Sequence, residues 1–103
     1  MNEELKSYRP IHPGEMLREE LESRGIKQKD FAPAIQLSCS MLSGILNEKR
    51  AISADVALRL EAALGIRAHI WLKLQSDYNL QTASSDKTIL KRLADIRKVA
   101  SIL

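Results

Sequence analysis

The chain has 103 residues, of which 45% are hydrophobic and only 4% aromatic, and its formal net charge is +3. This length predicts one domain with a single modest core, and the many Leu, Ile and Ala residues favour a helical bundle. No apolar run approaches the roughly 18 residues of a membrane span, and we expect no secretory signal in the polar N-terminus. The single cysteine, Cys39, cannot form an internal disulfide, which fits a reducing cytoplasm.

Positive charge is concentrated at one end of the chain. Residues 1–83 hold eleven Lys and Arg against eleven Asp and Glu, whereas residues 84–103 hold five cations against two carboxylates. A nucleic-acid partner would therefore need a local cationic patch, because the overall charge is too small to attract one.

The chain is expected to begin with a loosely held arm, residues 1–12, followed by a helix from Pro13 to about Arg24. Proline is tolerated in a first helical turn, and Glu15 lies favourably near the positive end of the helix dipole. Gly25 suits the position just past the helix end.

The stretch from Gln28 to Asn47 has the spacing of two short helices joined by a tight turn. The first helix would end near Ile35, and Ser38 is the expected N-cap of the second. Apolar residues at helical spacing would face the core from both helices: Phe31, Ala32, Ile35, Leu42, Ile45 and Leu46. This is the geometry of a helix-turn-helix, whose second helix enters the DNA major groove.

Two further helices are expected after a polar loop. One runs from a Ser53 cap to a Gly65 stop, and the next covers roughly Ala68 to Leu80. The second of these would bury Ile70, Trp71, Leu74 and Tyr78.

A last helix is predicted to begin near Asp86 behind a Ser85 cap. Its apolar residues have a 4-3-4-3 heptad spacing: Ile89, Leu93, Ile96, Ala100 and Leu103. Because this seam covers only about two heptads, it must pack either on its own domain or on a second copy of the chain.

The chain resembles the Cro/repressor-like (XRE) helix-turn-helix family and, within it, the HigA/VapI group of plasmid-maintenance antidote proteins. The resemblance covers about residues 10–80 and rests on the helix-turn-helix and on HPGEMLREEL, ILNEKRAISADVALRLEAALG and IWLKLQSDYNL. The opening and closing motifs together are more specific than a helix-turn-helix alone. The resemblance implies an all-α fold: a five-helix lambda-repressor-like DNA-binding domain at residues 13–80, with an additional C-terminal helix at 84–103 for dimerisation or packing.

The function implied by the resemblance is that of a non-enzymatic, cytoplasmic antitoxin of a type II toxin–antitoxin system. Such antitoxins form homodimers, bind operator DNA as autorepressors, and neutralise a partner toxin of the mRNA-interferase type. No cofactor is expected, and His12 and His69 are too isolated for a metal site or a catalytic base. Two alternatives remain open: a toxin neutraliser without sequence-specific DNA binding, and a solitary XRE-type transcriptional repressor.

The resemblance places the base-contacting positions on the second helix of the motif, and here those residues are short: Ser38, Cys39, Ser40, Ser43, Gly44 and, at the helix end, Asn47. None of them is an Arg or Gln able to make the bidentate contacts of strong direct readout. We therefore expect backbone positioning and shape readout, with modest base contacts from Ser40 and Ser43.

Phosphate contacts are expected from residues that flank this helix. Gln28 matches a phosphate-binding position of the family, and Lys27 replaces the usual Ser or Thr cap with a phosphate-seeking charge. Lys49 and Arg50 could clamp the DNA backbone just after the helix.

Each of these assignments has a simpler alternative. The short residues could form a plain solvent face, Gln28 could cap its own helix, and Lys49 and Arg50 could be solvated loop charges. The acidic stripe of Glu15, Glu19 and Glu22 is read first as a solvated face and second as a surface for a basic toxin.

Two departures from the family pattern predict an irregular motif. Gln36 occupies a turn position where the family commonly has a left-handed glycine, a conformation that costs another residue roughly 1 kcal/mol. Pro33 lies inside the first helix of the motif, where it removes a backbone hydrogen bond.

Overall fold

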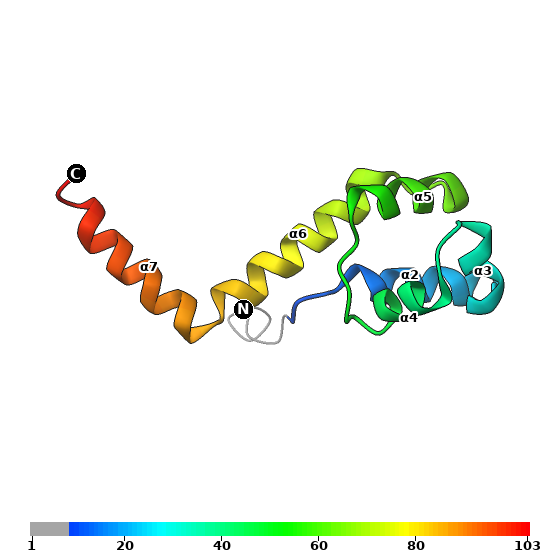
Figure 1. Cartoon of the computed structure of the whole chain (residues 1–103), viewed down its shortest axis with the longest axis horizontal. Coiled ribbons are helices and arrows are strands. Elements are labelled where there is room, and N and C mark those ends of the chain that lie inside the picture. The colour runs from blue at the N-terminus through cyan, green and yellow to red at the C-terminus, as the bar shows by residue number, and fades with distance from the viewer. Residues whose placement is uncertain (1–8) are drawn as a thin grey trace, which may run out of the picture.

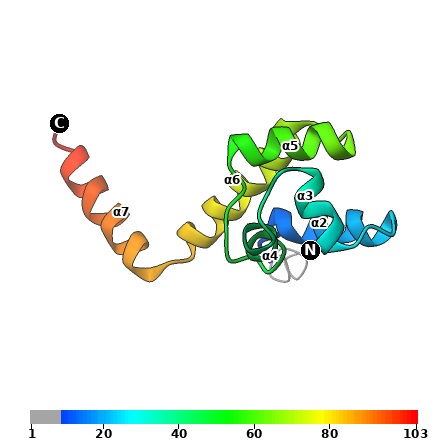
Figure 2. The same cartoon turned by 45° about the vertical axis from the view of Figure 1, so that its right-hand side comes forward.

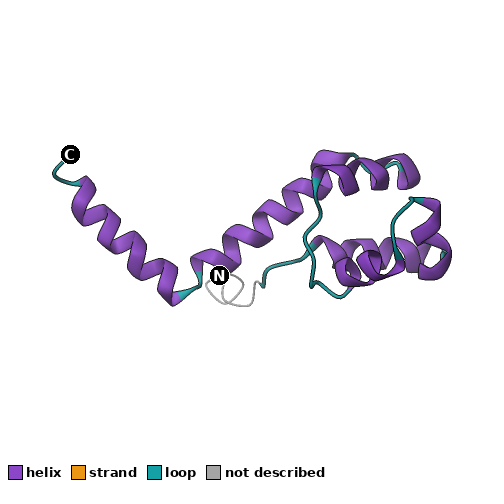
Figure 3. Cartoon of the chain, in the orientation of Figure 1, coloured by secondary structure: helices purple, strands orange, loops and turns teal. Residues whose placement is uncertain are grey.

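The structure is a computed structural model that describes residues 9–103. Its helices are α2 (Pro13–Ser23), α3 (Gln28–Ala34), α4 (Cys39–Leu46), α5 (Ala54–Leu64), α6 (Ala68–Ser84) and α7 (Lys87–Ala100). Figure 3 shows helices and loops, and no strand, over these residues. No helix in the described range is long and apolar enough to cross a membrane. The prediction of an all-α fold is confirmed.

Helices α2 to α5 and the first part of α6 pack into one body, whereas the rest of α6 and all of α7 extend away from it (Figures 1 and 2). The molecule is consequently elongated, with principal extents of 55, 33 and 23 Å. Helix α7 approaches α6 only near the turn that joins them and diverges from it in both views. The shape thus separates a helix-turn-helix body from an isolated C-terminal helix.

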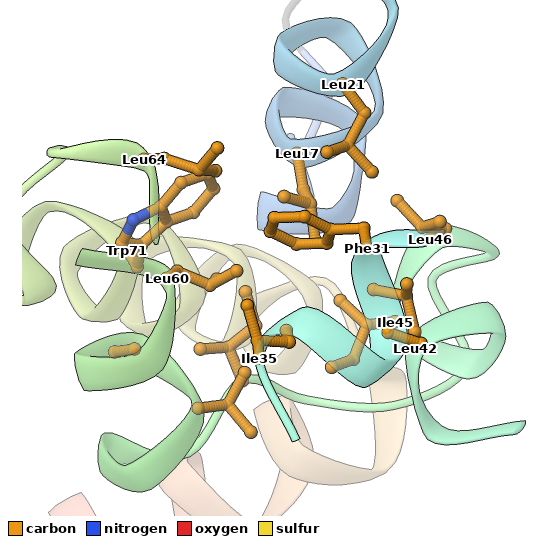
Figure 4. Packing of buried hydrophobic residues seen from close by; sticks show 14 residues of the cluster. Leu17, Leu21, Phe31, Ile35, Leu42, Ile45, Leu46, Leu60, Leu64 and Trp71 are labelled. Atoms are coloured by element: carbon orange, nitrogen blue, oxygen red, sulfur yellow. The ribbon is translucent and has the colours of Figure 1, made fainter. Parts of the chain in front are cut away.

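The core lies where α2, α3, α4, α5 and α6 converge, and it contains the apolar faces predicted from helical spacing (Figure 4). Leu17, Leu42 and Trp71 are fully buried, with 0% of their surface exposed. Truncating a buried leucine costs about 2–5 kcal/mol, so these side chains fix three helices relative to one another. All the predicted core residues of the helix-turn-helix are buried: Phe31, Ala32, Ile35, Leu42, Ile45 and Leu46.

Predicted caps begin two of the helices. The hydroxyls of Ser38 and Ser53 each accept a hydrogen bond from the backbone N–H three residues later, over 3.0 and 3.3 Å. Gly65 ends α5 in the left-handed conformation, with φ of 77°. These capping predictions are confirmed, because each local signal acts within one turn of its own helix.

The cap predicted for the last helix is wrong. Its N-cap is Asp86 rather than Ser85, and the Asp86 carboxylate accepts from the backbone N–H groups of Thr88 and Ile89 over 2.8 and 3.2 Å. One carboxylate thus satisfies two N–H groups at the positive end of the helix dipole, which a neutral hydroxyl does less well.

Helix α6 continues to Ser84, beyond its predicted end near Leu80. The polar stretch that suggested a break contains neither Gly nor Pro, and the Thr82 hydroxyl donates to the Tyr78 carbonyl one turn earlier over 3.0 Å, which is compatible with a helix. The predicted burial of Ile70 is also wrong, because this side chain is 39% exposed.

Candidate nucleic-acid interface

Helix α4 presents one face to the core and the opposite face to solvent. Ser40 and Asn47 are exposed and Gly44 is half-buried. These residues are separated by four and three positions, so they form one stripe along the helix. This stripe, the outer face of α4 (Ser40, Gly44 and Asn47), is the surface that α4 can offer to a partner.

Helix α2 supports α4 through a direct backbone approach at Gly14. A Cβ atom at this position would lie 2.0 Å from the Ile45 carbonyl oxygen and 3.0 Å from the Ile45 carbonyl carbon. No larger side chain fits while both helices keep their positions. The glycine of the HPGE motif therefore lets the first turn of α2 rest on the backbone of α4.

Arg18 adds a second contact from α2 at the same C-terminal end of α4. Its guanidinium donates to the Leu46 carbonyl over 3.0 Å and to Asn47 Oδ1 over 3.2 Å. The Asn47 amide nitrogen in turn donates to the Ser43 hydroxyl over 3.1 Å. A cation at the carbonyl end of a helix is favourable for the helix dipole. Sequence reasoning missed Arg18 because its backbone partner lies 28 residues away.

The turn between α3 and α4 is stabilised by Arg59 from α5. Gln36 adopts the left-handed conformation that is common for glycine at this position of the family, with φ of 58°. The Arg59 guanidinium donates to the carbonyls of Ile35 and Gln36 over 3.1 and 2.6 Å. The ion pair with Asp55 holds the guanidinium in place and lowers the pKa of that carboxyl. Pro33 stays within α3, which ends directly after it.

His12 joins the start of α2 to α6. Its side chain is only 2% exposed, and its Nδ1 accepts from the Gly14 backbone N–H over 2.9 Å. The Tyr78 ring lies edge-on to it, with 4.9 Å between ring centroids. Burial lowers the pKa of His12, and this effect is partly opposed by the charge of Glu48 and by a hydrogen bond with the Arg50 backbone. His12 is therefore an internal cap packed against the loop that follows α4.

Gln75 fixes the same loop from α6. It is 6% exposed, and its Oε1 accepts from the Ile52 backbone N–H over 2.8 Å. Its amide nitrogen donates to Asn79 Oδ1 over 3.1 Å. The only sequence signal for this contact was the polar residue itself, placed among the apolar positions of α6.

The remaining predicted residues on α3 and α4 are accessible. Lys27 and Gln28 lie exposed at the start of α3, where Lys27 makes no side-chain cap. Gln28 lines a shallow pocket beside Arg18, so it lies near the end of α4. Cys39 is exposed in the first turn of α4.

Lys49 and Arg50 return against α4 after a left-handed residue, Glu48, with φ of 63°. Both backbone N–H groups donate to the Gly44 carbonyl, over 2.8 Å from Lys49 and 3.1 Å from Arg50. Both side chains are exposed. The two predicted phosphate contacts are thus held beside the outer face of α4.

The outer face of α4 and the cations beside it form a surface suited to binding. Over residues 9–103, no group of three or more His, Cys, Asp and Glu side chains could hold a metal ion. The outer face of α4 is polar and uncharged, and lysine and arginine flank it at Lys27, Lys49 and Arg50. Such a surface suits a polyanion whose bases are contacted from a groove and whose phosphates lie at its edges.

Comparison with known proteins identifies the family to which this chain is similar. The helix-turn-helix family matches residues 17–71, more than half of the chain. The chain is 45% identical over 78 residues to virulence-associated protein I of Dichelobacter nodosus, an overlap of 75% of this chain and 72% of the relative.

Two solved antitoxin structures have the same fold. The Pseudomonas aeruginosa antitoxin HigA with the higBA promoter has 44% identity, a TM-score of 0.72 and coverage of 75% of this chain and 85% of that one. The antitoxin GraA has 40% identity, a TM-score of 0.73 and coverage of 77% and 86%. Residue types, fold and relatives agree: the chain belongs to the HigA/VapI group of the Cro/repressor-like helix-turn-helix family, whose members are non-enzymatic antitoxins and transcriptional regulators.

Proposed function

We propose that the protein is an antitoxin that binds operator DNA with the outer face of α4 and thereby represses its own genes in the cytoplasm. The observation that carries this proposal is the support of α4, whose C-terminal end α2 holds at Ile45 and Leu46 while the outer face stays accessible. A helix fixed in this way can enter a major groove without reorganising. The similarity to a HigA antitoxin solved with the higBA promoter supports the same role.

Affinity in this proposal comes mainly from phosphate contacts, because the side chains of α4 are short. Lys27, Gln28 and Lys49 would contact phosphates on either side of the groove. Ser40 is the exposed hydroxyl best placed for a base edge, and Cys39 lies beside it in the first turn. Ser38 contributes as the cap that positions that turn.

The proposal includes a homodimer paired through α7. No residue of α7 is buried within the described single chain, and Ile96 is 59% exposed. Because α7 ends at Ala100, the last predicted seam residue, Leu103, lies beyond the helix and is 96% exposed. A second copy would present the same heptad seam, as a two-fold dimer requires: Ile89, Leu93, Ile96, Ala100 and Leu103. On a palindrome, the two α4 helices would then read half-sites roughly 34 Å apart.

The partner toxin proposed here is a basic, mRNA-cleaving protein. Glu19 and Glu22 are exposed on α2, whereas Glu15 is paired with Arg9 over 3.0 Å. An exposed acidic pair would attract a protein whose own surface is built to bind RNA. Reversing both charges in the double variant Glu19→Lys/Glu22→Lys should weaken co-purification with the product of the adjacent gene. Unchanged co-purification would exclude α2 as the toxin surface.

A second candidate function is toxin neutralisation without sequence-specific DNA binding. One observation favours it: the Asn47 amide is bonded at its oxygen to Arg18 and at its nitrogen to Ser43. Two of the predicted base-contacting residues are therefore engaged inside the chain. A solitary repressor without a toxin would share every feature of the DNA-binding surface.

Fluorescence anisotropy with the chain's own upstream DNA and a scrambled duplex separates these functions. Tighter binding to the native duplex, weakening as salt rises, is the result expected for an operator-binding repressor. Weak and equal binding to both duplexes would favour the protein-binding candidate. Toxin co-purification then distinguishes an antitoxin from a solitary repressor.

A further inference from the structure

At the centre of the outer face of α4, the space that a side chain of the helix would fill is taken by a side chain from the following loop. Gly44 lies between Ser40 and Asn47 and has no side chain of its own. A Cβ atom at Gly44 would lie 2.7 Å from Arg50 Cδ, 2.9 Å from Arg50 Cγ and 3.0 Å from Arg50 Nε. The Arg50 side chain therefore lies across the outer face at Gly44.

The backbone of Arg50 is held firmly beside α4. Its N–H donates to the Gly44 carbonyl over 3.1 Å, as does that of Lys49 over 2.8 Å. Two residues later, the Gln75 side chain accepts from the Ile52 N–H over 2.8 Å. The backbone from which this arginine side chain starts is thus fixed, and the flexible side chain extends from it over Gly44.

The guanidinium of Arg50 is available for a partner. Arg18, Arg24 and Arg59 each donate to backbone carbonyls of the body. Within residues 9–103, no ion pair or side-chain hydrogen bond joins Arg50 to another group. In the described part of the chain, Arg50 therefore lies unpaired on the outer face of α4. If α4 enters a major groove, the Arg50 guanidinium can contact the groups in that groove.

We propose that Arg50 is the principal base-reading residue of this protein. Its side chain passes over Gly44 of the recognition helix α4, and its guanidinium contacts a guanine. A guanidinium is the side chain that pairs bidentately with guanine O6 and N7, the commonest specific contact in the major groove. The inference rests on the proposed operator binding, and it replaces the expectation from the sequence that Arg50 clamps the DNA backbone. It also explains how a helix whose outward-facing side chains are short can bind one sequence specifically. The long side chain that contacts the base comes from the loop that follows the helix.

Base reading and phosphate clamping differ in a measurable way. A lost phosphate contact weakens binding to all sequences about equally and reduces the salt slope by roughly one. A lost guanine contact weakens binding to the operator and removes the discrimination against replacement of one base pair, roughly 5- to 150-fold.

The test is anisotropy of the full chain on its operator and on duplexes in which each G·C pair is replaced singly. Arg50→Ala and Arg50→Lys should both bind the intact operator less tightly and lose their preference for one G·C pair, since lysine lacks the bidentate fork. Lys49→Ala is the matched control, and it should weaken binding to every duplex alike.

Gly44→Ala tests the position of the arginine separately. Alanine favours the helix, and the crowded atoms belong to a flexible side chain, so the variant should fold, as thermal melting will show. It should lose the same base preference as Arg50→Ala.

A uniform loss in Arg50→Ala, or full discrimination retained in Gly44→Ala, would overturn the inference while leaving operator binding intact. If the unaltered chain itself fails to prefer its operator, the proposed function is what fails.

Discussion

The support of α4 by α2 can be tested with one added methyl group, in Gly14→Ala. The new Cβ would lie 2.0 Å from the Ile45 carbonyl oxygen. Ordinary contacts of a Cβ begin at 3.4 Å, so the two backbones must separate by more than 1 Å. Neither group can rotate away, because the clash is with backbone and not with a flexible side chain.

The expected magnitude follows from two opposing effects. Alanine stabilises a helix relative to glycine by at most about 1 kcal/mol, the value for a helix interior, and Gly14 lies in the first turn of α2. Overpacking of a close contact costs about 1–3 kcal/mol, and sometimes more, and separation of α2 from α4 also loosens the packing of Leu17, which is 0% exposed. We expect a net destabilisation of about 1–2 kcal/mol, together with weaker operator binding because α4 moves.

Urea unfolding followed by circular dichroism measures this loss, with Gly44→Ala as the matched control. That variant adds the same methyl group to a helix but meets only the flexible Arg50 side chain, so its stability should equal or exceed that of the unaltered chain. If Gly14→Ala is as stable as Gly44→Ala, the close approach of α2 to α4 is not what holds the recognition helix.

Four further predictions test the body and the C-terminal helix. Arg18→Ala should cost about 1–2 kcal/mol in urea unfolding, because the Leu46 carbonyl loses a charged donor. Gln36→Gly should raise the unfolding free energy by up to about 1 kcal/mol, because it relieves the left-handed strain, whereas Gln81→Gly inside α6 should lower it. Because burial lowers the pKa of His12 from 6.5, the unfolded chain binds that proton more readily. The stability of the folded chain should therefore fall as the pH decreases through about 6.5. Urea midpoints measured across that range should depend less on pH in His12→Gln than in the unaltered chain. Deletion of residues 84–103 should convert a dimer to a monomer in light scattering, and an unchanged dimer would exclude the α7 seam.

Local signals predicted the helix-turn-helix well. The spacing of Phe31, Ile35 and Leu42 and the Ser38 cap act within one or two helical turns, so a sequence window contains everything they require. The last turn of α6 is harder to predict locally, because the polar residues Gln81–Ser85 suggest a break although no Gly or Pro stops the helix there.

The contacts that position α4 were beyond local reasoning. Arg18 binds a carbonyl 28 residues away, Gln75 binds an N–H 23 residues away, and Arg59 binds a carbonyl 24 residues away. In each case a side chain bonds to the backbone, and the sequence names only one partner of such a bond. For the same reason, Arg50 reads in the sequence as a solvated loop charge. Its side chain can lie on α4 because Gly44 has no side chain there, and this is visible only in the structure.

The segments that carry the family resemblance meet in the support of α4 and not on its outer face. His12 from the opening motif packs edge-on against Tyr78 from the closing motif, with ring centroids 4.9 Å apart, and Gln75 holds the loop that follows α4. The outer face contributes nothing to the buried core, since Ser40 and Asn47 are exposed. Substitution there can therefore change what is read at little cost in stability, whereas substitution in the support moves the whole helix. In this chain the residues that identify the family and those proposed to choose the operator are physically separate, and Arg50 is where the two sets meet: its backbone belongs to the support and its side chain to the outer face.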